Sequence, residues 1–399
     1  MKILVISHRV PFPPNKGEKL RTYHQLERLS QLGHSLSLIA PCAAVEDQQF
    51  AHGLSCVFDM RVTTNKLPFK LFRFIKALLS GRSLSEANFY SSGTQRLIEA
   101  EIATFQPDYL LLTASSLVKY ADASKTAKYR PIILTDFMDV DSNKWQQYEY
   151  KSTFPMNWVY RREAKLIRNL EIEATQISKE CYLIAAAEVE LFKREIYNTN
   201  TVNVLPNGID SSIFAPAPKI LETPALTLLF AGVMDYKPNI DAVFWFVDNC
   251  WPSIKTQYPD AKFVIAGMNP SSSVLKLRTD NNIVVTGFVD DIMPYFQSAT
   301  LFVAPFQIAR GVQNKVLQAM SCEIPVVTTA RGIEGIIHND GEDILIADSA
   351  IKYAQLCLDL LDSLELRTSI GKAARKTILT HYAWPEVLKP LTNQIENKP

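Results

Sequence analysis

The sequence predicts an α/β protein of two Rossmann-like domains, each built on a doubly wound parallel sheet. Short apolar runs alternate with helical patterns through both halves of the chain, as parallel sheets with covering helices require. The alternation stops near the Pro-rich stretch Ala215–Lys219 and then restarts. The chain has 399 residues, which is long for one hydrophobic core, so we expect two domains.

The composition is that of a globular protein, with 47% hydrophobic and 21% charged residues and a net charge of +1. Six scattered cysteines form no CxxC pair, and no histidine spacing completes a zinc site. No apolar run is long enough for a membrane span or a signal-peptide core. We therefore expect a cytoplasmic protein with no cofactor, no metal and no nucleic-acid partner.

The first domain is expected over residues 1–200. The opening run KILVIS predicts a buried parallel strand that ends at a Pro-rich loop from His8 to Gly17. A helix follows over residues 18–32, ends at Gly33 and leads into the strand SLSLIA. Further strands are predicted at 108–113, 131–136 and 180–185, with a long helix over 157–177. This order begins a doubly wound domain.

The second domain is expected over residues 201–380, with the boundary close to TVNVLPNGID, which reads as a strand, a Pro-Asn-Gly turn and a linker. Its predicted strands are LTLLFAGVM, AKFVIAGM, NIVVTGFV, TLFVAPF, PVVTT and DILIAD, and its predicted helices cover 239–256, 291–297 and 312–321. From Ala350 the chain reads as helical, with HYAWP as the break. We expect residues 381–399 to return to the first domain, with the segment around Trp384 packed on it.

Ligand-binding residues are expected where the parallel strands end, because loops there lead into helix N-termini that favour anions. Gly232, Gly267 and Gly287 each follow a predicted strand, and the loop 305–314 follows another. Close helix–strand packing also demands such glycines. Together they outline one crevice.

The segment ARGVQNKVLQAM carries the strongest signal. Gly311 lets the backbone approach a ligand, and the helix after it directs free N–H groups and partial positive charge to the same place. Arg310 and Lys315 add two full charges, which suit a diphosphate. The alternative is a basic helix start in solvent.

These residues resemble a known family. The C-terminal half, roughly 200–390, is similar to the GT-B glycosyltransferases of family 4, and the whole length resembles the sugar transferases of the exosortase/PEP-CTERM exopolysaccharide system. The resemblance rests on GVMDYKPNIDAVFWFVDNCWP, VTGFVDDIMPYF, ARGVQNKVLQAM with PVVTT, LPNGID, and TDFMDVDSNKWQQY.

The resemblance implies two facing domains, a hexose donor linked to UDP or GDP, and transfer with retention of configuration. Where family members commonly carry two glutamates eight positions apart, this chain has Arg310 and Gln318. The family's Arg and Lys after the first strand of the second domain are replaced by Val233 and Met234. We therefore assign the cationic role to Arg310 and Lys315, and ribose binding to Gln318. The expected donor-binding residues are Gly17, Gly232, Gly267, Gly287, Phe288, Val289, Gly311, Val312, Gln313, Asn314 and Gln318.

The acceptor is expected on the first domain. Asp139, Asp141, Lys144 and Trp145 are interpreted as an acceptor wall, because carboxylates bind sugar hydroxyls and an indole stacks on a sugar ring. Trp145 is equally consistent with a core residue, and a metal-binding role for the Asp-x-Asp pair is rejected. His8 ends the first strand and is a candidate catalytic residue that is also consistent with a structural role.

The segment KLPFKLFRFIKALLSGR places Lys66, Lys70, Arg73 and Lys76 along one face of a predicted helix, with apolar residues on the others. This is typical of a helix lying on anionic lipid, and equally of an amphipathic helix packed on its own sheet. Lipid contact would suit a polyprenyl-linked glycan acceptor and peripheral binding to the inner face of the membrane.

Two further functions stay open. Loss of both acidic positions is consistent with a non-catalytic GT-B protein that binds a nucleotide or supports a partner transferase. A sugar-nucleotide epimerase also uses two facing Rossmann-like domains.

Overall fold

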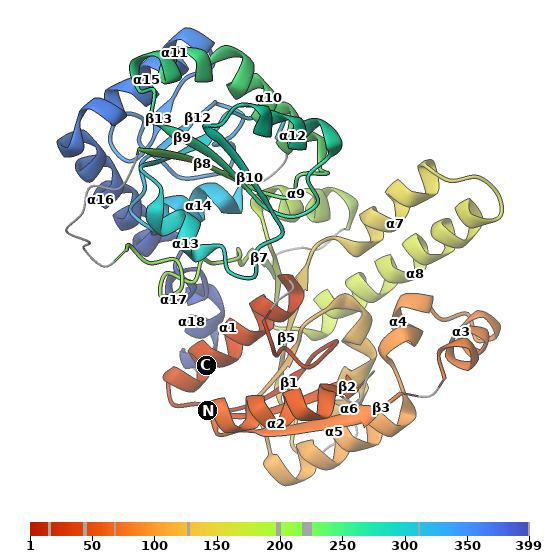
Figure 1. Ribbon diagram of the computed structural model, residues 1–399. Coiled ribbons are helices and arrows are strands. Elements are labelled where there is room, and N and C mark those ends of the chain that lie inside the picture. The colour runs from red at the N-terminus through yellow and green to blue at the C-terminus, as the bar shows by residue number, and fades with distance from the viewer. Residues whose placement is uncertain are drawn as a thin grey trace. The chain divides into compact units, whose positions relative to one another are not determined.

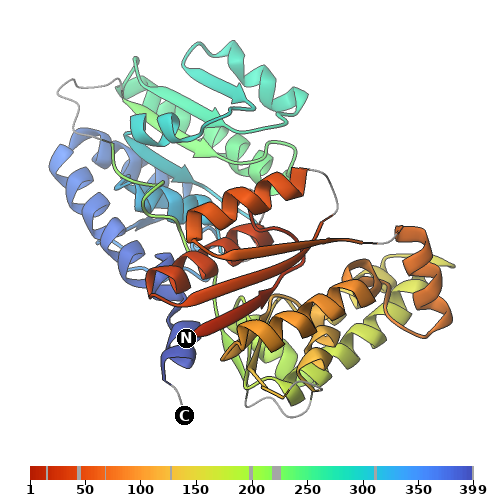
Figure 2. The same cartoon turned by 90° about the horizontal axis from the view of Figure 1, so that it is seen from below.

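The computed structural model describes residues 1–14, 17–42, 46–67, 69–125, 128–196, 201–217, 226–309 and 312–397. The chain divides into two compact units (Figures 1 and 2). The first contains Met1–Asn207 and Val387–Pro399, and the second contains Gly208–Glu386.

The first unit is built on a sheet of seven parallel strands in the order β3-β2-β1-β4-β5-β6-β7. The central strand β1 (Lys2–Ile6) pairs with β2 and β4, and three of its residues, Ile3 to Val5, have no exposed surface. Such continuous apolar runs belong to strands covered on both faces. The other strands are β2 (Ser35–Cys42), β3 (Arg61–Lys66), β4 (Tyr109–Leu112), β5 (Ile132–Met138), β6 (Glu180–Leu183) and β7 (Val202–Val204).

Helices connect these strands and cover the sheet. The predicted long helix over 157–177 is α8 (Met156–Ile177), which packs along α7 (Asp141–Tyr150) as a helical hairpin (Figure 1). The strand β3 was missed, because RVTTNK lacks an apolar pattern. The remaining helices are α1 (Gly17–Gln31), α2 (Glu46–Phe58), α3 (Lys70–Leu79), α4 (Leu84–Phe89), α5 (Ser92–Phe105), η1 (Ser115–Ala121), α6 (Asp122–Lys125) and α9 (Ala186–Glu195).

A buried ion pair joins α1 to the sheet. Arg21 donates to both carboxylate oxygens of Asp136 at 2.6 and 2.8 Å, and neither side chain has exposed surface. Gln25, one turn later on α1, donates to the same carboxylate at 2.6 Å. Arg21 also donates to Asn207 at 3.1 Å, so it holds the last residue of the first unit.

The second unit carries a sheet of six parallel strands in the order β10-β9-β8-β11-β12-β13. One core cluster contains the apolar residues of these strands and of the helices around them. The strands are β8 (Thr227–Ala231), β9 (Lys262–Ala266), β10 (Ile283–Gly287), β11 (Leu301–Ala304), β12 (Val326–Thr328) and β13 (Leu345–Ile346). The two parallel α/β sheets confirm the predicted fold class.

The prediction of one continuous helix over 239–256 is wrong. It is divided into α10 (Lys237–Asn249) and α11 (Trp251–Gln257), because Pro252 lacks the N–H that an uninterrupted helix would need. The other helices of this unit are α12 (Ser272–Lys276), η2 (Leu277–Thr279), α13 (Met293–Ser298), α14 (Asn314–Ser321), α15 (Ala350–Asp362), α16 (Leu364–His381) and α17 (Trp384–Val387).

The chain returns to the first unit at its end. In α18 (Lys389–Glu396), Leu391 and Ile395 are buried, and the Gln394 carbonyl accepts a hydrogen bond of 3.1 Å from Tyr109 on β4. The prediction that the segment around Trp384 packs on the first domain stays a prediction. Trp384 belongs to the second unit, where its ring lies so close to Gly208 that a Cβ there would be 2.7 Å away.

Candidate active site

A cavity of about 630 Å³ lies in the second unit, where β8, β9 and β10 end and α14 begins. This is the carboxyl edge of the sheet, where open parallel sheets bind their ligands. The lining residues are Ala231, Gly232, Val233, Tyr236, Asn239, Ala266, Gly267, Met268, Phe288, Val289, Ile292, Phe296, Asn314, Lys315 and Gln318.

Two glycines give the cavity a wall of bare backbone. The Gly232 N–H donates to the Ala266 carbonyl at 2.9 Å, so the ends of β8 and β9 are held together. A Cβ on Gly267 would lie 1.8 Å from the Gly232 carbonyl oxygen, and φ of Gly267 is +143°, so this position needs glycine. A Cβ on Gly232 would approach Asn239 Nδ2 at 2.8 Å and Lys315 Nζ at 3.0 Å.

Lys315 brings a cation to this wall from the first turn of α14. Its Nζ donates to Asn239 Oδ1 at 2.7 Å and lies 4.9 Å from the ring centre of Phe306 and 5.5 Å from that of Phe230. Burial lowers the pKa of Lys315 to about 8. Asn239 is nearly buried and fixes its amide by donating to the Val233 carbonyl at 2.8 Å. The ammonium thus keeps its full charge beside a neutral partner.

Seven of the fifteen residues that line this cavity were predicted from the sequence as ligand-binding. Of the predicted donor-binding residues and cations, Gly232, Gly267, Phe288, Val289, Asn314, Lys315 and Gln318 line it. Gly287, at φ +76°, precedes Phe288, while Val312 and Gln313 precede α14 and are not among the lining residues. Gly17 begins α1 in the first unit. Arg310 and Gly311 lie outside the described residues.

Three aromatic or amide residues that line the cavity were missed: Tyr236, Asn239 and Phe296. The run DYKPNID contains two of them, but no motif marks them as ligand-facing. Their position follows from the start of α10 beside α14, which the sequence pattern does not specify.

His8 lies in the first unit beyond the end of β1. Its Nε2 is 2.6 Å from Ser116 Oγ, and its ring stacks on Phe89 with 4.1 Å between ring centres. Burial, with a smaller contribution from the Arg9 charge, lowers the pKa of His8 to about 3. The imidazole is therefore neutral at physiological pH.

The predicted acceptor residues lie at the end of β5 and in α7. Asp139 and Lys144 are exposed, whereas Asp141 is half-buried and accepts from Ser115 at 2.8 Å. Burial raises the pKa of Asp141. Trp145 packs against Tyr148 and Tyr160 at 5.8 and 5.6 Å between ring centres, so aromatic neighbours contact its ring.

One buried carboxylate near these residues was missed. Glu171 on α8 accepts from the Ser142 N–H at 3.0 Å and from the Ser142 hydroxyl at 2.5 Å. Burial raises the pKa of Glu171 to about 8. The bond anchors the first turn of α7 and so supports the segment that carries Asp141.

Within the described ranges, no three His, Cys, Asp or Glu side chains are grouped to hold a metal ion. Among the same described residues, no helix has both the length and the apolar character of a membrane span.

Comparison with known proteins agrees with this geometry. Residues 225–363 match the model described as "Glycosyl transferases group 1", which covers most of the second unit and its cavity. These findings support a GT-B glycosyltransferase.

Two relatives and one solved structure illustrate the similarity. An uncharacterized 44.6 kDa protein in the cps region of Klebsiella pneumoniae is 22% identical over 89% of both chains. The Escherichia coli UDP-Gal:alpha-D-GlcNAc-diphosphoundecaprenol alpha-1,3-galactosyltransferase is 26% identical over 47% of this chain and 52% of its own. The crystal structure of Anabaena HepE in complex with UDP has a TM-score of 0.65 at 12% identity, with both chains fully covered. At that identity the match to HepE shows the fold alone.

Proposed function

We propose that this protein is a retaining glycosyltransferase of family 4 that moves a hexose from a UDP- or GDP-sugar to a glycan or lipid-linked glycan in exopolysaccharide or cell-surface polysaccharide synthesis. One observation carries the proposal: in the second unit the half-buried cation Lys315 lies beside the bare backbone of Gly232 at a helix start, and Gly267 lines the same cavity. Charge, free N–H groups and close backbone approach are what a nucleotide diphosphate needs.

In this proposal catalysis is mainly electrostatic. Lys315, the α14 N-terminus and Arg310 stabilise the departing diphosphate, and a phosphate oxygen of that group takes the acceptor proton. Gln318, one turn after Lys315 and facing the same cavity, binds the ribose hydroxyls as a neutral donor and acceptor. The remaining cavity residues contact the nucleotide and its sugar, and the reaction is independent of a metal ion.

The acceptor is assigned to the first unit, at Asp139, Asp141, Lys144 and Trp145. The exposed Asp139 and Lys144 are free to meet sugar hydroxyls, whereas the aromatic contacts of Trp145 favour packing over stacking on a sugar. His8, neutral at physiological pH, is assigned as a hydrogen-bonding group near the reaction and not as a charged acid.

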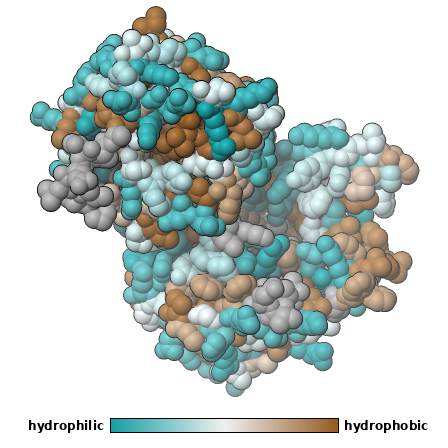
Figure 3. Space-filling view, viewed as in Figure 1, coloured by the Kyte–Doolittle hydropathy of each residue, from teal (hydrophilic) through white to brown (hydrophobic). Residues whose placement is uncertain are grey.

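Peripheral contact with the cytoplasmic membrane is part of the proposal. Apolar side chains gather over α3 and over the turn between α7 and α8, at the same end of the first unit (Figures 2 and 3). Phe69, directly before α3, is 70% exposed, Phe72 and Leu79 on α3 are 72% and 85% exposed, and Phe154 in the turn is 81% exposed. The lipid-linked acceptor in the name of the Escherichia coli relative supports this assignment.

The proposal is tested by incubating the purified protein with a panel of UDP- and GDP-sugars, with and without lipid-linked glycan, and analysing donor and products. Donor consumption that requires the acceptor, with an α-linked product from an α-linked donor, is expected. Epimerised donor would assign the protein to the epimerases, and nucleotide binding without turnover would make it a non-catalytic binding protein. Loss of activity in EDTA, restored by Mn²⁺ or Mg²⁺, would refute metal independence.

A further inference from the structure

A second cavity lies in the first unit, distant in sequence from the donor site. It has a volume of about 480 Å³ and is enclosed by the end of β3, the helix α3, the connection from α3 to α4, and the start of α5. Five basic residues line it: Lys66, Arg73, Lys76, Arg82 and Arg96. None of the described residues that line it is acidic. This charge pattern fits an anion with more than one negative charge.

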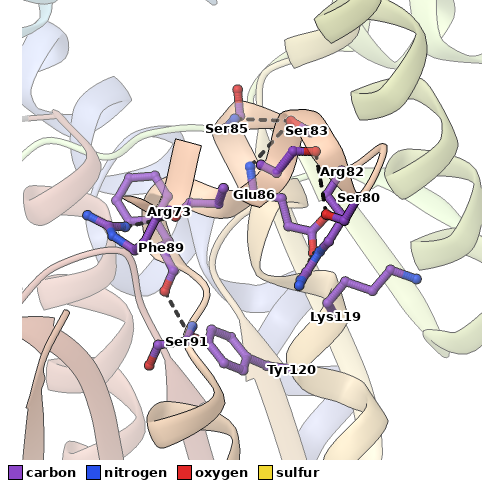
Figure 4. A network of polar contacts seen from close by, with 12 residues as sticks. Arg73, Ser80, Arg82, Ser83, Ser85, Glu86, Phe89, Ser91, Lys119 and Tyr120 are labelled. Carbon is purple, nitrogen blue, oxygen red and sulfur yellow. Dashed lines mark hydrogen bonds and ion pairs between the residues drawn. The ribbon is translucent and has the colours of Figure 1, made fainter. Parts of the chain in front are cut away.

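The basic side chains come from four separate places and are differently anchored. Arg73 donates to the carbonyls of Ala87, at 2.8 Å, and Asn88, so it is fixed between α3 and α4 (Figure 4). Arg82 bonds to Glu86, which is nearly buried, and its guanidinium lies 4.1 Å from the ring centre of Tyr90. The cavity therefore has two anchored guanidinium groups.

Lys66, Lys76 and Arg96 differ from these two because their side chains are exposed. Lys66 ends β3, Lys76 is in the last turn of α3, and Arg96 is in the first turns of α5. The wall of the cavity already holds two guanidinium groups. The three long, exposed cations therefore repel one another and these groups when the cavity is empty. A bound polyanion would relieve that repulsion.

The start of α5 contributes backbone groups to the same wall. Ser91 caps this helix by accepting from the Thr94 N–H at 3.0 Å, and the Tyr120 hydroxyl accepts from the Ser91 N–H at 2.9 Å (Figure 4). Ser92 and Gly93 line the cavity. A Cβ on Gly93 would lie 3.2 Å from Asn65 Nδ2, so glycine keeps this turn close to the end of β3. The positive end of a helix of 14 residues thus faces the basic side chains.

The rim of the cavity is apolar. Phe72 lines it and is largely exposed, and the neighbouring Phe69 and Leu79 carry the exposed apolar surface of α3 onward (Figure 3). A small water-soluble anion would gain no binding free energy from contact with this apolar rim. An amphiphile would place its charged group among the cations and its hydrocarbon chain along α3.

We propose that this cavity binds the diphosphate of a lipid-linked diphosphate, with α3 against the hydrocarbon chain. The assignment rests on the proposed function for the choice of lipid, because an enzyme that glycosylates a lipid-linked glycan must hold the phosphates of that lipid. Two phosphates match the number of cations better than the single phosphate of a bilayer phospholipid. The cavity would thus recognise the lipid end of the acceptor.

The test is flotation of the full chain with phosphatidylcholine vesicles that contain undecaprenyl diphosphate, in excess UDP so that the donor cavity does not contribute. Vesicles of the same charge made with phosphatidylglycerol, and vesicles of phosphatidylcholine alone, are compared. We expect at least tenfold more bound protein on the diphosphate vesicles than on either comparison. Equal binding to the two anionic vesicles would overturn the proposal, because it would show a general anionic surface.

Variants locate the binding. The triple substitution Lys66→Gln, Lys76→Gln and Arg96→Gln should reduce binding to the diphosphate vesicles at least tenfold, while the thermal melting temperature stays near that of the parent because these side chains are exposed.

The matched control Lys128→Gln, Arg130→Gln and Lys193→Gln removes the same charge from the same unit outside the cavity and away from α3, and should bind as the parent does. Equal losses in the two triple variants would also overturn the proposal.

UDP binding to the same preparation is measured by calorimetry. GDP binding is measured in the same way. Failure of the proposed function, seen as binding of neither UDP nor GDP, is thus distinguished from failure of the lipid site, and vesicle binding needs no transferase activity.

Discussion

Lys315 Nζ lies 2.7 Å from Asn239 Oδ1, so the one cation shown to line the cavity of the second unit within the described ranges is paired with a neutral amide. A carboxylate at that place would neutralise the ammonium before a ligand arrived. The amide orients it and leaves its charge for an incoming diphosphate. Burial makes the charge costly when the cavity is empty, which is why the pKa of Lys315 falls to about 8.

Substitution of Lys315 is the direct test of this arrangement. Lys315→Ala should weaken UDP binding by about 1.5–3 kcal/mol, the usual worth of a hydrogen bond to a charged group. Uridine, which has no phosphate, should bind nearly unchanged. Calorimetric titration measures both. The control Lys237→Ala removes an exposed lysine that is paired with Asp241 in the same unit, and it should leave both affinities intact. Equal losses for uridine and UDP would contradict the diphosphate role.

The same lysine predicts a pH dependence of binding. Lys315 is charged below its pKa of about 8, so UDP affinity should be greatest there and should fall as the pH rises through that value. Phosphate monoesters have lost their second proton near pH ~6, so a decline between about 7.5 and 9.5 belongs to the protein.

An arginine control isolates Lys315 as the titrating group. Lys315→Arg keeps its charge over this pH range and should remove the decline. UDP titrations at a series of pH values measure the effect, and the same decline in the arginine variant would assign it to another group.

The two glycines of the cavity should respond differently to alanine. Gly267→Ala places a Cβ 1.8 Å from the Gly232 carbonyl oxygen at φ +143°, and backbone strain of that kind costs about 1–3 kcal/mol before the clash is added. Its main effect should be a lower melting temperature. A Cβ on Gly232 meets the side-chain ends of Asn239 and Lys315, which can move.

Gly232→Ala should therefore keep most of the stability and lose UDP affinity. Thermal melts with and without UDP measure both effects. The interpretation of the cavity would be wrong if Gly232→Ala lowered stability and left UDP binding intact.

Strand patterns in the sequence predict part of the cavity of the second unit. Gly232, Gly267 and Phe288 were located because strands of a parallel sheet end at one edge, which strand patterns alone establish. Asn239 was not, because its contact with Lys315 joins residues 76 apart through the packing of two helices. No local sequence pattern specifies how these two helices pack against each other.

The basic cavity of the first unit shows the same limit. Lys66 was assigned to the helix that contains Lys70 and Lys76, but the polar run RVTTNK forms β3 and Lys66 ends it. Arg96 belongs to a separate helix, α5, and reaches the cavity through tertiary packing. The pattern of this segment was consistent with contact to anionic lipid and equally with a helix packed on its own sheet, whereas the cavity itself depends on contacts between α3, α4 and α5.

The buried ion pair between Arg21 and Asp136 predicts a large effect on stability. Arg21→Met leaves the Asp136 carboxylate in a site with no exposed surface, with hydrogen bonds from Gln25 and from the Met138 N–H, and should lower the free energy of unfolding by about 3–5 kcal/mol. The double variant Arg21→Met with Asp136→Leu should recover part of that loss, because no charge is then buried. Urea unfolding measures both variants. If the double variant lost as much free energy of unfolding as Arg21→Met and Asp136→Leu lose together, the two residues would not be coupled.

The last prediction concerns Arg310, whose role is inferred from the sequence alone. Arg310 occupies a position where the similar transferases commonly have glutamate, five residues before Lys315. If it binds the diphosphate, Arg310→Ala should weaken UDP binding by about 1.5–3 kcal/mol and leave uridine binding unchanged. If it instead binds an acidic donor sugar, the loss should appear only with that nucleotide sugar and vanish with UDP.

Arg310→Glu restores the family's usual residue and decides between tolerance and electrostatics. Arg310→Glu should weaken UDP binding more than Arg310→Ala does. Val233 and Met234 occupy the positions where those relatives carry Arg and Lys. Within the described part of the cavity, Lys315 would then face two phosphates and a new carboxylate. Transfer rates and UDP affinities of the two variants, measured side by side, give the answer. A fully active Arg310→Glu enzyme would mean that charge at this position does not matter, and the electrostatic account of donor binding would have to rest on Lys315 and the helix α14.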